Sequence, residues 1–270
     1  MYLDNNIMTG RKVIFMECNE ENGFLPLPDA SVQADIIYLS SPNNPTGAVY
    51  TREQLKKWVD YALEMDAVIL FDAAYNCFIQ DKELPRSIFS IEGAKRCAIE
   101  FCSFSKIASL TCASTGYTII PHELSRGGVQ LKKLWARRQS TKIDNHSYIL
   151  QRGASALFSK EGRAQIGKNL QFYMENAKVL SDALRRRHIW FTGGANSPYI
   201  WFKCPGQVSS WEFFDYLLEN ANIVGTPGAG FGANGEGYFR ISALADRVSI
   251  MTAAQRLANL YYLSLIHIWG

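Results

Sequence analysis

The sequence predicts an α/β fold in which a mostly parallel sheet comes first and a smaller α+β unit follows. Short apolar runs rich in β-branched residues alternate with helical patterns in the first half of the chain, which is typical of a parallel sheet covered by helices on both faces. A polar cluster directly follows each of three such runs. In the second half, a long helical pattern precedes shorter strands and helices. We therefore expect a large domain over residues 1–165 and a small domain over residues 166–262 that includes the long linking helix.

The elements of the first half follow from the spacing of apolar residues and from helix-start signals. No helix signal is present at the start, and residues 12–16 have the pattern of a short strand. A helix is expected from Thr51, whose hydroxyl can cap it, to about Met65. Further strands are expected at residues 35–39, 67–71, 97–102 and 115–120.

The second half is predicted to begin with helical residues 147–187, interrupted near residues 159–162. Two helices are then expected among three short strands, which indicates a mixed α+β unit rather than a second parallel sheet. The expected elements are strand 199–202, helix 209–220, strand 223–224, strand 238–241 and helix 247–262.

Composition excludes several classes of protein. The 270 residues carry a net charge of +3, and 47% of them are hydrophobic, which is ordinary for a globular chain with a core. The six cysteines form no CxxC pair and no secretion signal precedes them, so we expect reduced thiols, no zinc site and a cytoplasmic location. No apolar run is long enough to span a membrane. The basic run 185–187 is expected to be a solvated helix face rather than a nucleic-acid surface.

Three polar clusters at strand ends are the candidate functional residues. The carboxyl ends of parallel strands meet at one edge of a sheet, where ligands bind. The turn Ser41–Gly47 contains two prolines and a glycine and could hold Asn44 toward a ligand oxygen, although a plain loop is equally consistent with it. Asp72 could pair with a buried cation or cap the next helix. Lys106 on its own would be a surface lysine, but at a strand end it could be a desolvated nucleophilic amine.

The order and spacing of these clusters carry more information than any one of them. Asp72 follows Asn44 by 28 residues, and Lys106 follows Asp72 by 34 residues. This set resembles the fold-type I, class I and II aminotransferases. Six further segments resemble the LL-diaminopimelate aminotransferase subfamily, and the resemblance runs from about Tyr2 to about Tyr262. The segments are GAKRCAIEFCSFSK, LWARRQSTK, SYILQR, NSPYIWFK, SSWEFFDYLLE and GTPGAGFGANGEGYFRIS.

The resemblance implies a cofactor, pyridoxal 5′-phosphate, and a fold of type I with an incomplete large domain that binds it. Lys106 is then the catalytic lysine, which holds the cofactor and moves the substrate proton. The cofactor-binding residues implied are Asn44, Asp72, Tyr75, Ser103, Ser105 and Lys106. Asp72 would pair with the ring nitrogen, Asn44 and Tyr75 with the ring oxygen, and the serines with the phosphate.

The substrate side of the site is implied in the same way. Arg240 would bind the substrate α-carboxylate with its planar guanidinium, although on its own it could be a surface arginine at a strand edge. Asn44 and Asp144 are the other substrate-binding residues implied. Asn196 and the glycine-rich segment 225–237 would shape the pocket, or form only a tight turn. No metal is implied.

The implied reaction is transfer of an amino group between LL-diaminopimelate, or its cyclic keto precursor, and glutamate or 2-oxoglutarate in lysine biosynthesis. Two alternatives stay open. One is another class I aminotransferase that acts on aspartate or aromatic substrates, and the other is an inactive truncated fragment. The full-length protein would be a homodimer with small amino and keto acids as its ligands, and without nucleic-acid or membrane partners.

The sequence departs from the subfamily pattern in several places. Further residues would be expected before Tyr2, with a cofactor-stacking tyrosine and a phosphate loop. Ser114 stands where an arginine would bind the phosphate, which a compensated frameshift could explain, and Asp144 stands where an asparagine is expected. The tail 263–270 interrupts the last helix pattern and is interpreted as an adaptor scar.

Overall fold

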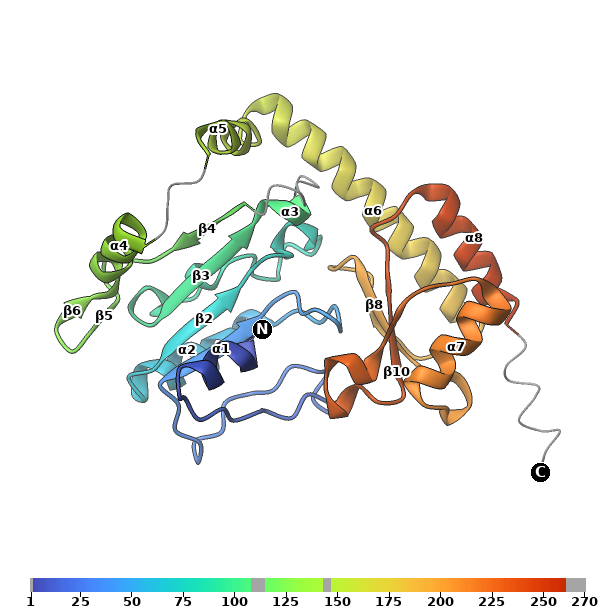
Figure 1. The fold of residues 1–270 in the computed structure, drawn as a ribbon, viewed down its shortest axis with the longest axis horizontal. Helices are drawn as coiled ribbons and strands as arrows, with labels where there is room; N and C mark the ends of the chain where they lie inside the picture. Colours follow the sequence, from blue (N-terminus) through green and yellow to red (C-terminus); the bar gives the residue numbers. More distant parts are fainter. Residues whose placement is uncertain (1, 108–114, 143–146, 261–270) are drawn as a thin grey trace.

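The computed structural model describes residues 2–107, 115–142 and 147–260. Two separate sheets, each with its own hydrophobic cluster, lie on either side of the described chain and are bridged along one edge by the long helix α6 (Figure 1). The helices are α1 (Tyr2–Met8), α2 (Arg52–Glu64), α3 (Phe104–Ile107), α4 (Leu131–Lys142), α5 (Tyr148–Ala156), α6 (Lys160–Arg186), α7 (Ser210–Ala221) and α8 (Arg247–Ala258). The strands are β1 (Ile36–Ser40), β2 (Val68–Asp72), β3 (Ala98–Ser103), β4 (Gly116–Ile119), β5 (Ser125–Arg126), β6 (Val129–Gln130), β7 (Phe191–Gly193), β8 (Tyr199–Lys203), β9 (Thr226–Pro227) and β10 (Tyr238–Ser242).

The large sheet has the strand order β1-β2-β3-β4. Strands β1, β2 and β3 are parallel, and β4 pairs antiparallel with β3. The four predicted strands and the expected mostly parallel sheet are therefore confirmed, with the fourth strand reversed because a short connection returns the chain alongside β3.

Helix α2 covers the large sheet with its apolar face. Thr51 accepts a hydrogen bond from the backbone of Gln54, and the Gln54 side chain accepts one from Thr51 N, so the predicted cap is a full capping box. Leu55 and Val59 are fully buried against Ile69 and other sheet residues. Each such side chain contributes roughly 1.5–3 kcal/mol through burial.

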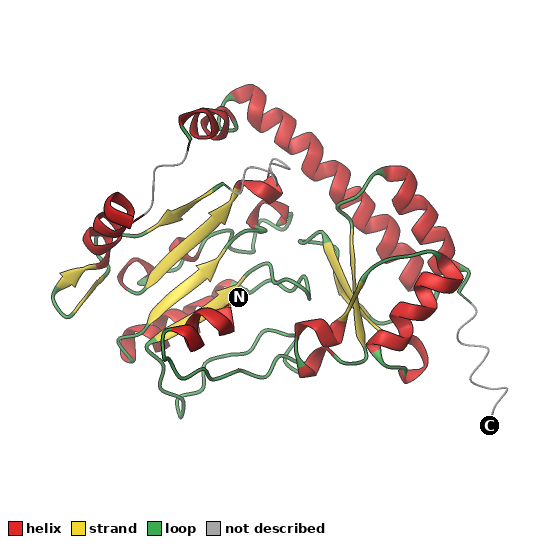
Figure 2. Ribbon diagram, viewed as in Figure 1, coloured by secondary structure: helices red, strands yellow, loops and turns green. Residues whose placement is uncertain are grey.

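The small sheet, with the order β7-β8-β10-β9, is entirely antiparallel (Figure 2). Successive side chains along each strand point to opposite faces of the sheet. Ile200, Phe202, Phe239 and Ile241 are buried in a cluster with α6, α7 and α8. The residues between them point the other way, toward the large sheet.

Three predictions about local structure are wrong. Residues 2–8 form α1, although no helix start was expected, because contacts with the large sheet hold it: the Tyr2 ring stacks on Tyr38 with centroids 4.9 Å apart. Residues 12–16 form no strand because no neighbouring strand pairs with them. Residues 223–224 also form none, since the chain leaves α7 through the left-handed Asn222 and pairs with β10 only at β9.

A stretch over residues 17–26, which contains a turn at residues 20–24 and is here called the connecting segment, touches both sheets. Its Phe24 is 4% exposed and packs edge-on against Trp201 and Tyr238 of the small sheet, with centroids 6.2 and 5.5 Å apart. At the other end, the Pro26 carbonyl accepts hydrogen bonds from the Tyr50 hydroxyl at 3.0 Å and the Trp58 indole at 3.1 Å. The segment therefore joins the two hydrophobic clusters.

A buried carboxylate lies within the large sheet. Glu100 of β3 is 2% exposed, and one of its oxygens accepts hydrogen bonds from the Ser87 hydroxyl at 2.7 Å and from Ile88 N at 2.9 Å. These bonds hold the short 3₁₀ helix Ile88–Ser90 against the sheet. Burial raises the pKa of Glu100 in spite of the hydrogen bonds, because the charged form loses its hydration.

We predict that Glu100→Gln flattens the pH dependence of stability. A carboxyl whose pKa is raised in the folded state contributes stability at acidic pH that is lost as the pH rises through the folded pKa. Glutamine keeps an acceptor for Ser87 and Ile88 but carries no charge. Urea unfolding from acidic to neutral pH should therefore show the variant gaining stability relative to wild type as the pH rises.

The control for this prediction is Glu100→Leu, which leaves the Ser87 and Ile88 donors unpaired. That change should cost about 1–3 kcal/mol at neutral pH. A Glu100→Gln variant whose stability differs from wild type by the same amount at every pH would contradict the prediction.

Candidate active site

Three of the predicted site residues meet at the carboxyl edge of the large sheet. Asn44 follows β1, Asp72 ends β2 and Lys106 lies in α3, directly after β3. The strands are in parallel register, with Ser40 opposite Asp72 and Asp72 opposite Phe101. The predicted gathering of polar residues at one edge of the sheet is therefore present in the structure.

The loop that carries Asn44 is held rigid by its neighbours. The Thr46 hydroxyl donates to Asn43 Oδ1 at 3.0 Å, and Gly47 N donates to the Asn43 carbonyl at 2.8 Å. Gly47 has a φ of +68°, and a Cβ there would lie 2.6 Å from Gly193 Cα and 2.8 Å from the Tyr199 carbonyl oxygen. Only glycine lets this loop rest so closely on the small sheet.

The Asp72 carboxylate uses its two oxygens differently. Oδ1 accepts a hydrogen bond from Ala74 N at 3.0 Å, which closes a local Asx turn; it caps no helix, because Tyr75 is the N-cap of the following 3₁₀ helix. Oδ2 accepts one from the Tyr2 hydroxyl. Burial and the neighbouring Asp72 raise the pKa of the Tyr2 phenol, so it stays a donor. A cationic ring nitrogen could pair with Oδ2 only by sharing it with Tyr2 or displacing it.

Tyr75 lies between the large-sheet edge and the small sheet. Its hydroxyl is 2.8 Å from the Tyr199 hydroxyl, and Lys106 Nζ lies 5.7 Å from the centre of its ring. Burial and the hydroxyl bond to Tyr199 raise the pKa of Tyr75. Ser103 Oγ accepts a hydrogen bond from Ser105 N at 3.2 Å, so both serines lie in the turn that leads to Lys106.

Arg240 reaches the same edge from the small sheet. Its Nη1 donates to Asn44 Oδ1 at 2.5 Å and its Nη2 to Thr226 Oγ1 at 3.1 Å. Its guanidinium carbon lies 4.5 Å from the ring centre of Tyr199 and 4.9 Å from that of Phe231. The alternative of an arginine on a solvated strand edge is therefore not what the structure shows.

Within the described residues, the charge of Arg240 meets no acidic side chain. Its Nε is buried, without a hydrogen-bond acceptor among the same residues. Burial lowers the pKa of the guanidinium, because desolvation penalises its charged form. A cation held by an amide, a hydroxyl and two aromatic faces is suited to receive a carboxylate from a ligand.

The remaining predicted site residues have varied outcomes. Asp144 and Ser114 lie outside the described residues. Asn196 Oδ1 accepts from Gln80 N at 2.8 Å and Asp81 N at 3.0 Å, so its oxygen ties the small sheet to a large-sheet loop. Within the glycine-rich segment, a Cβ on Gly228 would lie 1.9 Å from the Gly235 oxygen, so that part is a tight turn.

Sequence reasoning did not single out Tyr199, and it included Thr226 and Phe231 only as part of the glycine-rich segment 225–237 that was expected to shape the pocket. A signal for Tyr199 was available: it is a tyrosine inside the otherwise apolar strand YIWFK, and alternation places it opposite to Ile200. Thr226 and Phe231 lie in irregular chain around β9, where no periodic pattern indicates which way a side chain points.

The donor set fits pyridoxal phosphate at this edge. A carboxylate, an amide, a phenol, an amine and two hydroxyls of the large sheet come together, and they match a ring nitrogen, a ring oxygen, an aldehyde and a phosphate. Across the parts of the chain that are described, no three His, Cys, Asp or Glu side chains are grouped as metal ligands. No described helix is both long and apolar enough to cross a bilayer.

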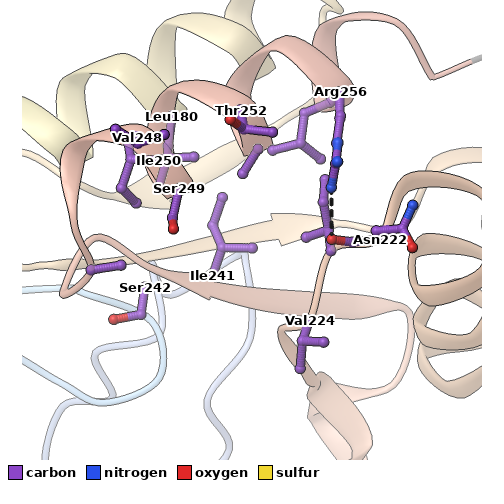
Figure 3. A pocket seen from close by; sticks show the side chains of 14 residues that line it. Leu180, Asn222, Val224, Ile241, Ser242, Val248, Ser249, Ile250, Thr252 and Arg256 are labelled. Atoms are coloured by element: carbon purple, nitrogen blue, oxygen red, sulfur yellow. Dashed lines mark hydrogen bonds between the residues drawn. The ribbon is translucent and has the colours of Figure 1, made fainter.

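A separate cavity of about 340 Å³ lies beside the small sheet, between α8, β10 and residues 222–224 (Figure 3). Its walls are mainly apolar, and Arg256 at its rim donates to the Asn222 carbonyl at 3.0 Å. None of the site residues described above lines it, so we do not assign the chemistry there.

Comparison with known proteins agrees with this geometry. The aminotransferase class I and II family matches residues 2–257. The chain is 50% identical to LL-diaminopimelate aminotransferase of Prochlorococcus marinus subsp. pastoris and 48% identical to that of Bacteroides thetaiotaomicron. Each alignment covers 96% of this chain and 67% of the relative, so the chain spans about two thirds of the length of these proteins.

Solved structures show the same relation. L,L-diaminopimelate aminotransferase from Chlamydomonas reinhardtii superposes with a TM-score of 0.83 at 40% identity, over 88% of this chain and 59% of that one. BacF from Bacillus subtilis superposes with a TM-score of 0.81 at 26% identity, over 95% of this chain and 65% of that one. The fold, the arrangement of the strand-end residues and these similarities together place the chain in the aminotransferase class I and II family.

Proposed function

We propose that this chain belongs to a pyridoxal-phosphate-dependent transaminase. It would transfer an amino group between LL-diaminopimelate, or its cyclic keto precursor, and glutamate or 2-oxoglutarate, in lysine biosynthesis. The observation that carries this proposal is Arg240, a partly buried cation with no acidic partner in the described chain that lies against Asn44 at the edge shared with Asp72 and Lys106. The half-identical relatives with that name support the substrate.

Each site residue would have a distinct role. Asp72 would pair with the ring nitrogen, Asn44 and Tyr75 would donate to the ring oxygen, and Ser103 and Ser105 would bind the phosphate. Pyridoxal phosphate, when bound, supplies an electron sink for the bonds at the substrate Cα. The Lys106 amine would accept the Cα proton and return it, acting as general base and then as general acid.

Substrate would be held from the other side. Arg240 would bind the α-carboxylate through two parallel N–H groups, and Asn44 would contact both ligands. Asp144, from its place in the sequence, would also contact substrate. The aromatic faces beside Arg240 exclude water and so strengthen the attraction between the charges.

The alternative substrates are those of other class I aminotransferases. Solved aromatic and aspartate aminotransferases superpose with TM-scores of 0.77 and 0.80. At 23% and 22% sequence identity, these similarities support a shared fold and not a shared substrate. Offering LL-diaminopimelate, aspartate and phenylalanine in turn with 2-oxoglutarate separates these possibilities, since glutamate formation from the first alone supports the proposed substrate.

We further propose that the protein acts as a cytoplasmic homodimer with domains at residues 1–165 and 166–262. Helix α5 exposes Tyr148 at 73% and Ile149 at 79%, and Ala154 is its buried residue, so most of its apolar surface is open to a partner. An exposed apolar helix face of this kind marks a contact surface. The five described cysteines are free thiols, which suits a reducing compartment.

We predict that Lys106 alone holds the cofactor covalently. Wild-type chain mixed with pyridoxal phosphate should gain a visible absorption band that borohydride bleaches, and peptide mapping should then find the added mass on Lys106. Lys106→Ala should show neither signal. Lys82→Ala, an exposed lysine in the loop after Ile79, should behave as wild type. A label on another lysine, or no band with wild type, would argue against the assignment.

We predict that Arg240→Lys weakens binding of 2-oxoglutarate by about tenfold or more. Lysine keeps the charge but cannot form two parallel hydrogen bonds, and losing one such bond to a charged group costs about 1.5–3 kcal/mol. Isothermal titration calorimetry measures the affinity directly. Arg247→Lys is a matched control, because Arg247 also lies over an aromatic ring, that of Phe172, but already pairs with Glu175 at 2.6 Å. Equal losses in both variants would refute a specific role.

We predict that Ile149→Glu converts dimers to monomers. A charge placed on the exposed apolar face of α5 would have to be desolvated on association, which opposes the contact. Sedimentation velocity should give a dimer for wild type and a monomer for the variant. Val248→Glu, at an equally exposed valine of α8, should leave the dimer intact. A monomeric wild type would exclude the proposed assembly.

A further inference from the structure

Tyr199 lies where the two halves of the site meet. It is the first residue of β8 and is 6% exposed. Its side chain packs with Tyr75 and Phe78 in a small apolar cluster. On one side it contacts Tyr75 of the proposed cofactor site, and on the other it contacts Arg240 of the proposed substrate site.

The hydroxyl of Tyr199 decides which way the Tyr75 hydroxyl can donate. The two oxygens are 2.8 Å apart, so one of the two hydroxyls donates to the other. Each phenol has a single proton. If Tyr75 is to donate forward to a ligand oxygen, Tyr199 must donate to Tyr75. A donor behind Tyr75 also makes its own proton a stronger hydrogen-bond donor.

The ring of Tyr199 supports Arg240. The guanidinium carbon lies 4.5 Å from the Tyr199 ring centre, on a side chain that has no acidic partner in the described residues. A π face stabilises a cation without occupying its N–H groups. The ring therefore holds Arg240 in place and leaves its donors available to a carboxylate.

The backbone at Tyr199 fixes this arrangement. The Tyr199 carbonyl accepts a hydrogen bond from Gly194 N at 2.9 Å. Cβ atoms placed on Gly193 and Gly47 would lie 2.3 and 2.8 Å from the same oxygen, so the loop carrying Asn44 packs directly on it. Little movement of Tyr199 is possible without moving Asn44 as well.

We propose that Tyr199 is a positioning residue that orients Tyr75 through its hydroxyl and Arg240 through its ring. The inference rests on the proposed function and adds to it a side chain that couples the cofactor half of the site to the carboxylate half. The titratable or charged groups that act on Tyr75 are Asp72 and Lys106 from the large sheet and Tyr199 and Arg240 from the small sheet.

Two substitutions separate the two roles of Tyr199. Tyr199→Phe removes only the hydroxyl, and Tyr199→Leu removes the ring as well. Tyr61→Phe is the matched control: Tyr61 is 8% exposed, and its hydroxyl donates to the carbonyl of Val32 in the loop before β1. All three variants lose one phenol hydrogen bond, so a general loss of stability would affect them alike.

The spectroscopic arm follows the absorption of bound pyridoxal phosphate against pH. Tyr199→Phe and Tyr199→Leu should both move the midpoint of the spectral change upward by about half a pH unit or more, because a weaker Tyr75 donor stabilises the ring oxygen anion less. Tyr61→Phe should leave the midpoint where wild type has it. An unmoved midpoint in Tyr199→Phe would overturn the hydroxyl role.

The binding arm uses 2-oxoglutarate and calorimetry. Tyr199→Phe should bind it like wild type, whereas Tyr199→Leu should bind several-fold more weakly because Arg240 loses its support. Wild-type affinity in Tyr199→Leu would overturn the ring role. If wild type binds neither pyridoxal phosphate nor 2-oxoglutarate, the proposed function fails and this inference falls with it. Normal binding by wild type together with unchanged Tyr199 variants overturns this inference alone.

Discussion

Three parallel strands end together, and the position of every large-sheet site residue depends on that constraint. Because β1, β2 and β3 are in register, the chain must leave each of them at one edge, at Asn44, Asp72 and Lys106 respectively. Hydrogen bonds between the strands already pair their backbone N–H and C=O groups. The side chains that follow the strand ends are therefore available for a ligand. The core of α2 and the sheet therefore fixes the site without forming part of it.

The small sheet contributes residues to the site because successive side chains along its strands point to opposite faces. Ile200 and Phe202 lie in the core, so Tyr199 and Trp201 must face the opposite way, and Arg240 and Tyr238 do the same on β10. One strand pair thus stabilises the small unit and supplies residues to the site. The strand pair therefore has both a structural and a site role, which explains why the partly buried Arg240 is tolerated: the core behind the strands holds its neighbours in place.

Much of this arrangement could be predicted from the sequence, and the limits have physical reasons. The runs that became β1 and β2 are apolar, the run that became β3 is apolar except for Glu100, and polar residues directly follow all three in sequence, so the strand-end site could be inferred from local pattern. The Tyr75–Tyr199 contact joins residues 124 apart, and no local pattern encodes it. Strand β7 is only three residues long, and α4 has no buried face, so neither carries the apolar spacing on which element prediction relies. Helix α1 depends on the stacking of Tyr2 on Tyr38 rather than on its own propensity.

The connecting segment has a thermodynamic consequence for the two hydrophobic clusters. A chain with two cores can lose one while keeping the other, which would give a partly folded state. Here Phe24 is buried among small-sheet rings, and two residues later the Pro26 carbonyl receives hydrogen bonds from Tyr50 and Trp58 of the other core. Opening either core would strip contacts from this short stretch and so weaken the other. The segment thereby makes the melting of the two units cooperative, so the site between them stays intact only while both cores are folded.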